Sequence, residues 1–153
     1  SYILMKKNTI YVDADACPVK KQIIDAAGRF NKPVLFVASY ASYSADREAE
    51  WVFVDQKKEE ADLYIVNHAQ SGDLVITQDM GLASLLTGRG ILVLSNRGQV
   101  IRDQEMAEIL NRRYLAYKSL AAGRKIRGPR PFNDQERKKF YAALTNLLCQ
   151  LDQ

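Results

Sequence analysis

Five short runs of mainly β-branched, aromatic and aliphatic residues recur along the chain. They cover residues 9–13, 34–38, 51–54, 74–77 and 91–94. The runs are continuously apolar rather than alternating, which is typical of strands buried on both faces, and strands that alternate with helices indicate βαβ units. The chain is therefore predicted to be an α/β protein with three layers, α/β/α, and a mainly parallel sheet of about five strands.

Helical periodicity predicts five helices, over residues 18–30, 59–70, 81–86, 103–122 and 133–148. Gly123 is expected to cap the end of the fourth helix, and Asn133 with Glu136 resembles a capping box at the start of the fifth. A length of 153 residues fits one hydrophobic core. We predict a single domain over residues 1–153, in which residues 1–8 form a flexible extension and residues 103–150 a helical, basic C-terminal part.

Two carboxylates, Asp13 and Asp15, stand at the end of the first run. Residues two apart in an extended chain point the same way, so both carboxylates can face one point, where they repel unless a cation or proton lies between them. Oxygen-only ligands suit Mg²⁺ or Mn²⁺. An acidic residue that closes a buried strand is costly unless it is needed there. Asp13 is therefore predicted to have a functional role.

Further carboxylates follow later elements. Asp79 comes just after the fourth run, and ligands of open α/β sheets gather at the carboxyl ends of strands, where strand order reverses. Asp13, Asp15 and Asp79 should converge if the first and fourth strands are neighbours. Glu59 and Asp62 could add a carboxylate from the start of a helix. The alternatives are that Asp79 only caps a helix and that Asp62 is a solvated helix residue.

Basic residues are concentrated in the last third of the chain. Residues 1–96 carry 10 basic and 12 acidic side chains, a net charge of −2, whereas residues 97–153 carry 12 basic and 6 acidic ones, a net charge of +6. Between Arg112 and Arg130 there are seven basic residues and no acidic one. This asymmetry indicates an anionic partner, or else a solvated basic helix face.

The cysteines and the apolar residues favour a cytoplasmic protein with no membrane partner. Cys17 and Cys149 do not form a disulfide framework, and no stretch approaches the roughly 20 apolar residues that cross a bilayer. His68 is the only histidine, which argues against His-based triads and His-rich zinc sites.

Several motifs resemble the YaiI/YqxD family of uncharacterised bacterial proteins. They are residues 10–18, 72–79 with Leu82 and Ala83, 96–98 and 128–129, and the likeness extends over residues 9–148. That family is similar to PIN-like domains, which are metal-dependent nucleases with a parallel sheet and clustered acidic residues. The resemblance thus implies a PIN-like domain that hydrolyses phosphodiester bonds, with RNA as the expected substrate.

The resemblance also implies roles for individual residues. Mg²⁺ or Mn²⁺ would be held by Asp13, Asp62 and Asp79. Asp15 would be a ligand, an orienting group or the base that takes a proton from water. The catalytic residues are accordingly expected to be Asp13, Asp15 and Asp79. Glu59 departs from the Asp that is commoner in its motif, so Asp62 is the preferred ligand. The basic residues expected to hold nucleic acid by charge are Arg97, Arg112, Arg113, Arg124, Lys125, Arg127 and Arg130.

Smaller roles are expected of hydroxyls and tyrosines. Hydrogen bonds to phosphate oxygens are expected from Ser44, Thr77 and Ser95, and stacking on bases from Tyr40, Tyr43, Tyr114 and Tyr117. Tyrosines at helical spacing are, however, more often packing residues.

Two other functions fit the same residues. A haloacid-dehalogenase-like phosphatase also opens with a strand ending in Asp-x-Asp, with Asp13 as nucleophile and Asp15 as acid and base. It requires a lysine for the transferring phosphate, for which Lys57 and Lys58 are the nearest candidates. The other alternative is a non-catalytic module that binds RNA through the basic residues. Besides nucleic acid, a second copy of the chain is an expected partner, in a homo-oligomer.

Overall fold

The computed structural model describes residues 8–39, 49–55, 59–124 and 131–152. The strands in this part of the chain are β1 Ile10–Asp13, β2 Val34–Ser39, β3 Glu50–Val54, β4 Leu74–Ile76, β5 Leu92–Leu94 and β6 Val100–Ile101. The helices are α1 Lys20–Arg29, α2 Glu60–His68, α3 Met80–Thr87, α4 Asp103–Ala121 and α5 Asp134–Leu151. The expected extension over residues 1–8 lies outside the described residues, apart from Asn8.

The described strands form one open sheet with the order β3-β2-β1-β4-β5-β6. β1 pairs in parallel with both β2 and β4, so Ile10 lies opposite Val34 on one side and Leu74 on the other. β3 and β5 extend the parallel sheet, and β6 runs antiparallel beside β5. The prediction of an α/β fold with a mainly parallel sheet is confirmed, with β6 as a sixth strand that the sequence did not indicate.

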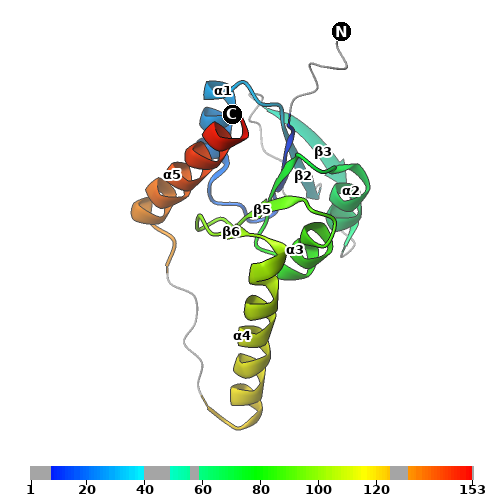
Figure 1. The fold of residues 1–153 in the computed structure, drawn as a ribbon, viewed down its shortest axis with the longest axis vertical. Helices are drawn as coiled ribbons and strands as arrows, with labels where there is room; N and C mark the ends of the chain where they lie inside the picture. The colour runs from blue at the N-terminus through cyan, green and yellow to red at the C-terminus, as the bar shows by residue number, and fades with distance from the viewer. Residues whose placement is uncertain (1–7, 40–48, 56–58, 125–130, 153) are drawn as a thin grey trace.

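Helices cover both faces of this sheet (Figure 1). α1 and α5 pack together on one face, over a core that includes Phe36, Ile76 and Phe140. α2 and α3 pack on the other face, over a core that includes Val37 and Val75. Neighbouring residues of a strand, such as those at 75 and 76, thus enter different cores. This explains why the strands are continuously apolar in sequence.

Several helix ends follow sequence signals, whereas α2 ends two residues before and α5 three residues after the predicted end. The Asn133 side chain accepts a hydrogen bond from the Glu136 amide at 3.1 Å and so caps α5, as expected. Gly123, with a φ of 79°, directly follows the C-cap of α4. α1, however, begins at Lys20 rather than at Pro18, because residues 14–17 close a tight turn through a hydrogen bond from the Cys17 amide to the Ala14 carbonyl.

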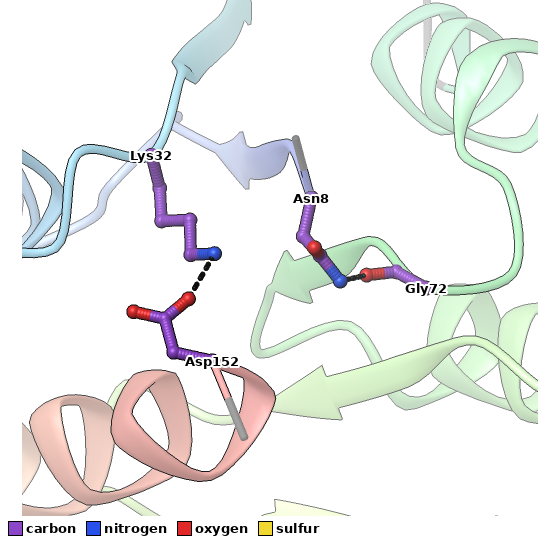
Figure 2. Close-up of polar contacts among 4 residues, drawn as sticks. All are labelled: Asn8, Lys32, Gly72 and Asp152. Carbon is purple, nitrogen blue, oxygen red and sulfur yellow. Dashed lines mark hydrogen bonds and ion pairs between the residues drawn. The ribbon is translucent and has the colours of Figure 1, made fainter. Parts of the chain in front are cut away.

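The edge of the sheet where the strands begin is held by structural contacts, which Figure 2 shows. The Lys32 ammonium group pairs with Asp152 at 2.5 Å and so ties the end of α5 to the segment before β2. The Asn8 side-chain amide donates to the Gly72 carbonyl beside the start of β4. These contacts involve no concentration of carboxylates, unlike those at the opposite edge.

α5 also passes close to the turn between β5 and β6. Gly98 in this turn has a φ of 86°, and a Cβ atom there would lie 3.2 Å from the Lys139 carbonyl oxygen and 3.3 Å from the Ala143 Cβ. Glycine therefore allows both the turn and the close approach of the helix.

Within the described part of the chain, the buried residues of α4 lie near its start. Met106 and Ile109 are buried, and the helix packs against α3 and β6. The rest of α4 extends away from the sheet (Figure 1). Within the described residues, no helix combines the length and the apolar character that crossing a membrane requires.

Candidate active site

The carboxyl ends of β1 and β4 form the point where the strand order of the sheet reverses. From β1 the chain continues to β2 and β3 on one side, and β4 leads to β5 and β6 on the other. Ligands of open α/β proteins bind in the crevice that such a reversal leaves outside the strand ends. Asp13 closes β1, and Thr77 and Asp79 follow β4 at the same edge. β1 and β4 are therefore neighbours, as the predicted convergence of these carboxylates requires.

Thr77 connects Asp13 and Asp79 through its hydroxyl group. The buried hydroxyl donates to Asp13 Oδ2 at 2.9 Å and accepts from the Asp79 amide at 3.0 Å. The Asp79 carboxylate in turn caps α3 by accepting from the Leu82 amide at 3.1 Å. Asp79 is thus a helix cap, as one interpretation of the sequence held, and its carboxylate also faces the same pocket as Asp13.

Asp15 is held by the end of β2 rather than by β4. It is exposed, and it accepts hydrogen bonds from the Ser39 amide at 3.1 Å and the Ser39 hydroxyl at 3.3 Å. β1 ends at Asp13, and Asp15 lies in a tight turn in which Ala16 has a φ of 59°. The two carboxylates are therefore brought together by a turn and not by the alternation of an extended strand.

Asp62 comes from the first turn of α2. Partial burial and the negative charges of Asp79 and Asp13 raise its pKa to about 6, and a hydrogen bond to Asp79 contributes to the rise. Burial likewise raises the pKa of Asp13, opposed by the hydrogen bond from Thr77 and assisted by the charges of Asp15 and Asp79. Carboxylates from β1, α2 and α3 thus interact electrostatically.

These groups line one pocket of about 910 Å³. Its polar lining comprises Asp13, Asp15, Ser39, Asp55, Glu59, Asp62, Asp79 and Ser84. Its apolar lining includes Val54, Leu63, Val66, Leu82 and Leu85. Six lining residues are acidic, and none of the described lining residues is basic. The pocket therefore has a strongly negative polar side beside an apolar wall.

The carboxylate oxygens that line the pocket are ligands of the kind that a hard divalent cation prefers. All the charged groups are carboxylates, and their mutual repulsion is what a cation relieves. Among the described residues, however, no three His, Cys, Asp or Glu side chains are already arranged as a metal site. A cation at Asp13, Asp62 and Asp79 therefore requires side-chain adjustment around the positions that the structure shows.

Comparison with known proteins gives the family. Residues 11–150 match the family model described as "Uncharacterized BCR, YaiI/YqxD family" (DUF188). This chain belongs to the YaiI/YqxD family. A UPF0178 protein of Bacillus cytotoxicus is 46% identical over 139 residues, which cover 91% of each chain. One of Shouchella clausii is 44% identical over 147 residues, 95% of this chain and 96% of the relative. No solved structure matches the chain significantly.

Four of the expected nucleic-acid ligands of this YaiI/YqxD member belong to the described residues, and none of these four lines the pocket. Arg97 pairs with Glu136 at 3.3 Å and lies 5.3 Å from the centre of the Phe132 ring, where it helps to fix α5 to the β5–β6 turn. Arg112 and Arg113 are exposed on α4, and Arg124 is exposed just after it. The remaining expected ligands, Lys125, Arg127 and Arg130, lie outside the described residues.

Other expected polar groups form internal hydrogen bonds. The Thr77 hydroxyl is engaged with Asp13 and Asp79, as described above. The Ser95 hydroxyl is buried and accepts from the Arg97 and Gln99 amides, so it shapes the turn after β5. The hydrogen of the Thr77 hydroxyl is therefore already donated to Asp13, and the Ser95 hydroxyl is buried in its own turn. Ser44, Tyr40, Tyr43, Lys57 and Lys58 lie outside the described residues.

Ser39 and the apolar wall were missed in the sequence. Ser39 is the polar residue directly after the second apolar run, at the same strand edge as Asp13, and this position is the signal that could have revealed it. Leu63 and Leu85 gave no signal, because an apolar residue on an amphipathic helix normally indicates packing. Both are exposed, at 53% and 59%, and both line the pocket.

Replacing Asp62 with Asn is expected to stabilise the protein in a pH-dependent manner. A carboxyl whose pKa rises on folding, here from 3.8 to about 6, favours the folded state only while it is protonated. Ionisation of Asp62 therefore lowers the free energy of unfolding progressively as the pH rises from about 4 to about 6, and the free energy stays lowered at higher pH. Asp62→Asn removes the penalty, which is about 1 kcal/mol at pH 7.5 after solvent screening.

Urea unfolding in the presence of a chelator, at pH 4.5 and pH 7.5, measures this effect. Glu50→Gln, which neutralises an exposed carboxylate on β3 outside the pocket, is the matched control and should show no comparable growth of stability with pH. An Asp62→Asn gain that is equal at both pH values would contradict the electrostatic coupling.

Proposed function

We propose that this pocket is the active site of a nuclease that uses Mg²⁺ or Mn²⁺ to hydrolyse phosphodiester bonds, with RNA as substrate. The observation that carries the proposal is the gathering of carboxylates from β1, α2 and α3 at the reversal point of the sheet. Such crevices bind ligands in open α/β proteins. Asp79 caps α3 and Asp15 binds the end of β2, but these contacts do not require carboxylates from three elements to share one pocket.

The absence of basic residues from the described lining supports a requirement for a cation. A phosphodiester is an anion, and the pocket presents six carboxylates to it. At contact distances the repulsion between like charges in a partly buried site amounts to several kcal/mol. Phosphate can therefore approach the acidic groups only when a divalent cation neutralises them.

The chain's own residues divide into two groups in this function. Asp13, Asp62 and Asp79 would hold the cation after side-chain adjustment, and the hydrogen bonds of Thr77 to Asp13 and of Asp79 to the start of α3 support this assignment. A bound Mg²⁺ or Mn²⁺ supplies charge to polarise a phosphate and acidify a water molecule. Asp15, kept at the pocket by Ser39 and exposed to solvent, can accept the proton of that water.

Exposed basic residues outside the pocket support nucleic acid as the substrate. Arg112, Arg113 and Arg124 are available on and beside α4, and such residues bind a phosphate backbone through charge irrespective of its sequence. The leucines of the apolar wall, Leu63 and Leu85, offer contact to a base near the cleaved bond.

Asp79→Asn gives the sharpest test, because asparagine caps helices as well as aspartate does and retains the acceptor for the Leu82 amide. Its thermal stability should therefore equal or exceed that of the parent, because one of the negative charges that raise the pKa of Asp62 is removed. Cleavage of labelled single-stranded RNA and DNA with Mn²⁺ should fall by about 100-fold or more. The parent without a divalent cation is the control for metal dependence.

Other outcomes would favour the alternatives. Equal cleavage by the parent and Asp79→Asn would point to a contaminating nuclease. A trapped aspartyl-phosphate at Asp13 would show the phosphatase instead. RNA binding without cleavage, and without dependence on Asp79 or a divalent cation, would show a binding module.

A further inference from the structure

Two exposed leucines of the pocket wall belong to neither core of the described fold. Leu63 of α2 and Leu85 of α3 are 53% and 59% exposed, and both line the pocket together with Val66. Leu63 lies about 200° around the helix from Ile65, the buried residue of α2. The two helices pack against each other, so their leucines form one surface. An apolar surface that is exposed inside a pocket is typical of a ligand site.

This wall adjoins the carboxylates of the same pocket. Leu63 directly follows Asp62 on α2, and Leu85 comes six residues after Asp79, about 9 Å further along α3 at 1.5 Å per residue. The pocket of about 910 Å³ lies within the range of roughly 300–1,000 Å³ that is usual for small-molecule sites. It therefore suits a ligand that joins a group held at the carboxylates to an uncharged part that contacts the leucines.

We propose that Leu63 and Leu85 bind the nucleobase of the nucleotide at which RNA is cleaved, and so act as specificity-determining residues. The inference rests on the proposed nuclease function. One sugar separates a nucleobase from its phosphate, so a phosphate bound at the carboxylates brings its own nucleobase to the adjoining wall. Enzymes that extrude a nucleobase hold it between aromatic or apolar side chains in this way. The bound nucleobase has to leave its stack, and the cleaved nucleotide is therefore unpaired.

Charge and size favour a nucleobase over other apolar ligands. A nucleobase is uncharged at neutral pH, so the six carboxylates of the pocket do not repel it as they would repel an anionic lipid. Two leucine side chains present much less surface than the roughly 800 Å² that each partner contributes to a stable protein interface. The flat face of a single nucleobase can cover them.

An RNA that lacks one nucleobase tests the wall without any change to the carboxylates. The probe is a labelled single strand in which one residue is 1-deoxyribose, which keeps the sugar and both phosphates. Cleavage is measured with Mn²⁺ at a substrate concentration well below KM. The parent should cleave one of the two bonds that flank this residue at least about 10-fold more slowly than the same bond of the intact RNA.

The matching change in the protein is Leu63→Ala combined with Leu85→Ala. This variant should lower kcat/KM for the intact bond by about 10-fold and leave the rate at the bond without its nucleobase within about twofold of the parental rate. The two losses do not add, because each removes the same contact. Alanine favours helices, so α2 and α3 should stay folded, which circular dichroism checks. Leu115→Ala, which truncates an exposed leucine on α4, is the control and should change neither rate.

The outcomes separate this inference from the proposed function. A parent that does not cleave intact RNA with Mn²⁺ overturns both. If cleavage depends on Asp79 but is equally fast at the bond without its nucleobase, or if the double variant is as active as the parent, the wall does not bind a nucleobase and the nuclease function stands. Calorimetry with spermidine and a chelator gives the remaining outcome. A double variant that binds spermidine more weakly but cleaves RNA at the parental rate would assign the wall to an organic cation.

Discussion

Asp13→Asn is expected to lower the Mn²⁺-dependent cleavage of RNA by about 1,000-fold without loss of stability. The Thr77 hydroxyl can still donate to an amide oxygen at this position, so the local hydrogen bond is kept. Burial and two neighbouring carboxylates raise the pKa of Asp13, which means that its charge is unfavourable in the folded protein. The variant should therefore unfold at the same or a higher urea concentration than the parent at pH 7.5.

Thr77→Val is the control that separates positioning from charge. It keeps the Asp13 carboxylate but removes the hydrogen bond that lowers the Asp13 pKa. A smaller loss of cleavage is expected, about 10-fold, together with a shift of the acidic limb of the pH–rate profile to higher pH. If Asp13→Asn were to cleave RNA at the parental rate, this carboxylate would have no part in the reaction.

Phe140→Ala is expected to cost about 3–5 kcal/mol of folding free energy, the largest effect on stability that we predict. Phe140 projects from α5 into the core between α5, α1 and the sheet, where its side chain is fully buried. Truncation leaves a cavity that the surrounding strands cannot fill, because they are fixed by pairing on both sides. Since domains of this size are stable by about 5–15 kcal/mol, the variant should be close to unfolding at 37 °C.

Equilibrium urea denaturation measures this cost. The control is Leu115→Ala, which truncates an exposed side chain of α4 and should change the free energy of unfolding by less than about 0.5 kcal/mol. A cost below about 1 kcal/mol for Phe140→Ala would show that α5 is not docked on α1. Because α5 lies on the face opposite α2 and α3, the folded fraction of Phe140→Ala should retain Mn²⁺-dependent cleavage. Loss of stability and loss of activity are thereby assigned to different parts of the molecule.

The elements with strong local signals were predicted successfully. Residues 10–12 are β-branched or aromatic and residues 74–76 are aliphatic, and each run lies in a parallel strand, fully buried in β4 and partly buried in β1. β6 has two residues, too few to show any periodicity, and it exists because the β5–β6 turn brings them back beside β5. The start of α1 was displaced by a turn at residues 14–17, for which the sequence carries no strong marker.

A site residue could be predicted where the sequence showed that it follows the end of a strand. Asp13 and Asp79 follow apolar runs, so the general behaviour of parallel sheets brings them to one edge. The role of Thr77 as a link between them depends on the orientation of a single hydroxyl, which no sequence pattern encodes. Arg97 was expected to bind nucleic acid, because the sequence does not show that Glu136 and Phe132 come to lie against it.

The sequence by itself determined the α/β class, the parallel pairing of its strands and the carboxylates at their ends, because these follow from local periodicity and from side chains adjacent in the chain. Tertiary structure decided which carboxylates share a pocket, which hydroxyls hold them and which basic residues remain exposed. Those properties arise from contacts such as that between Thr77 and Asp13, 64 residues apart, and the fold alone brings such residues together.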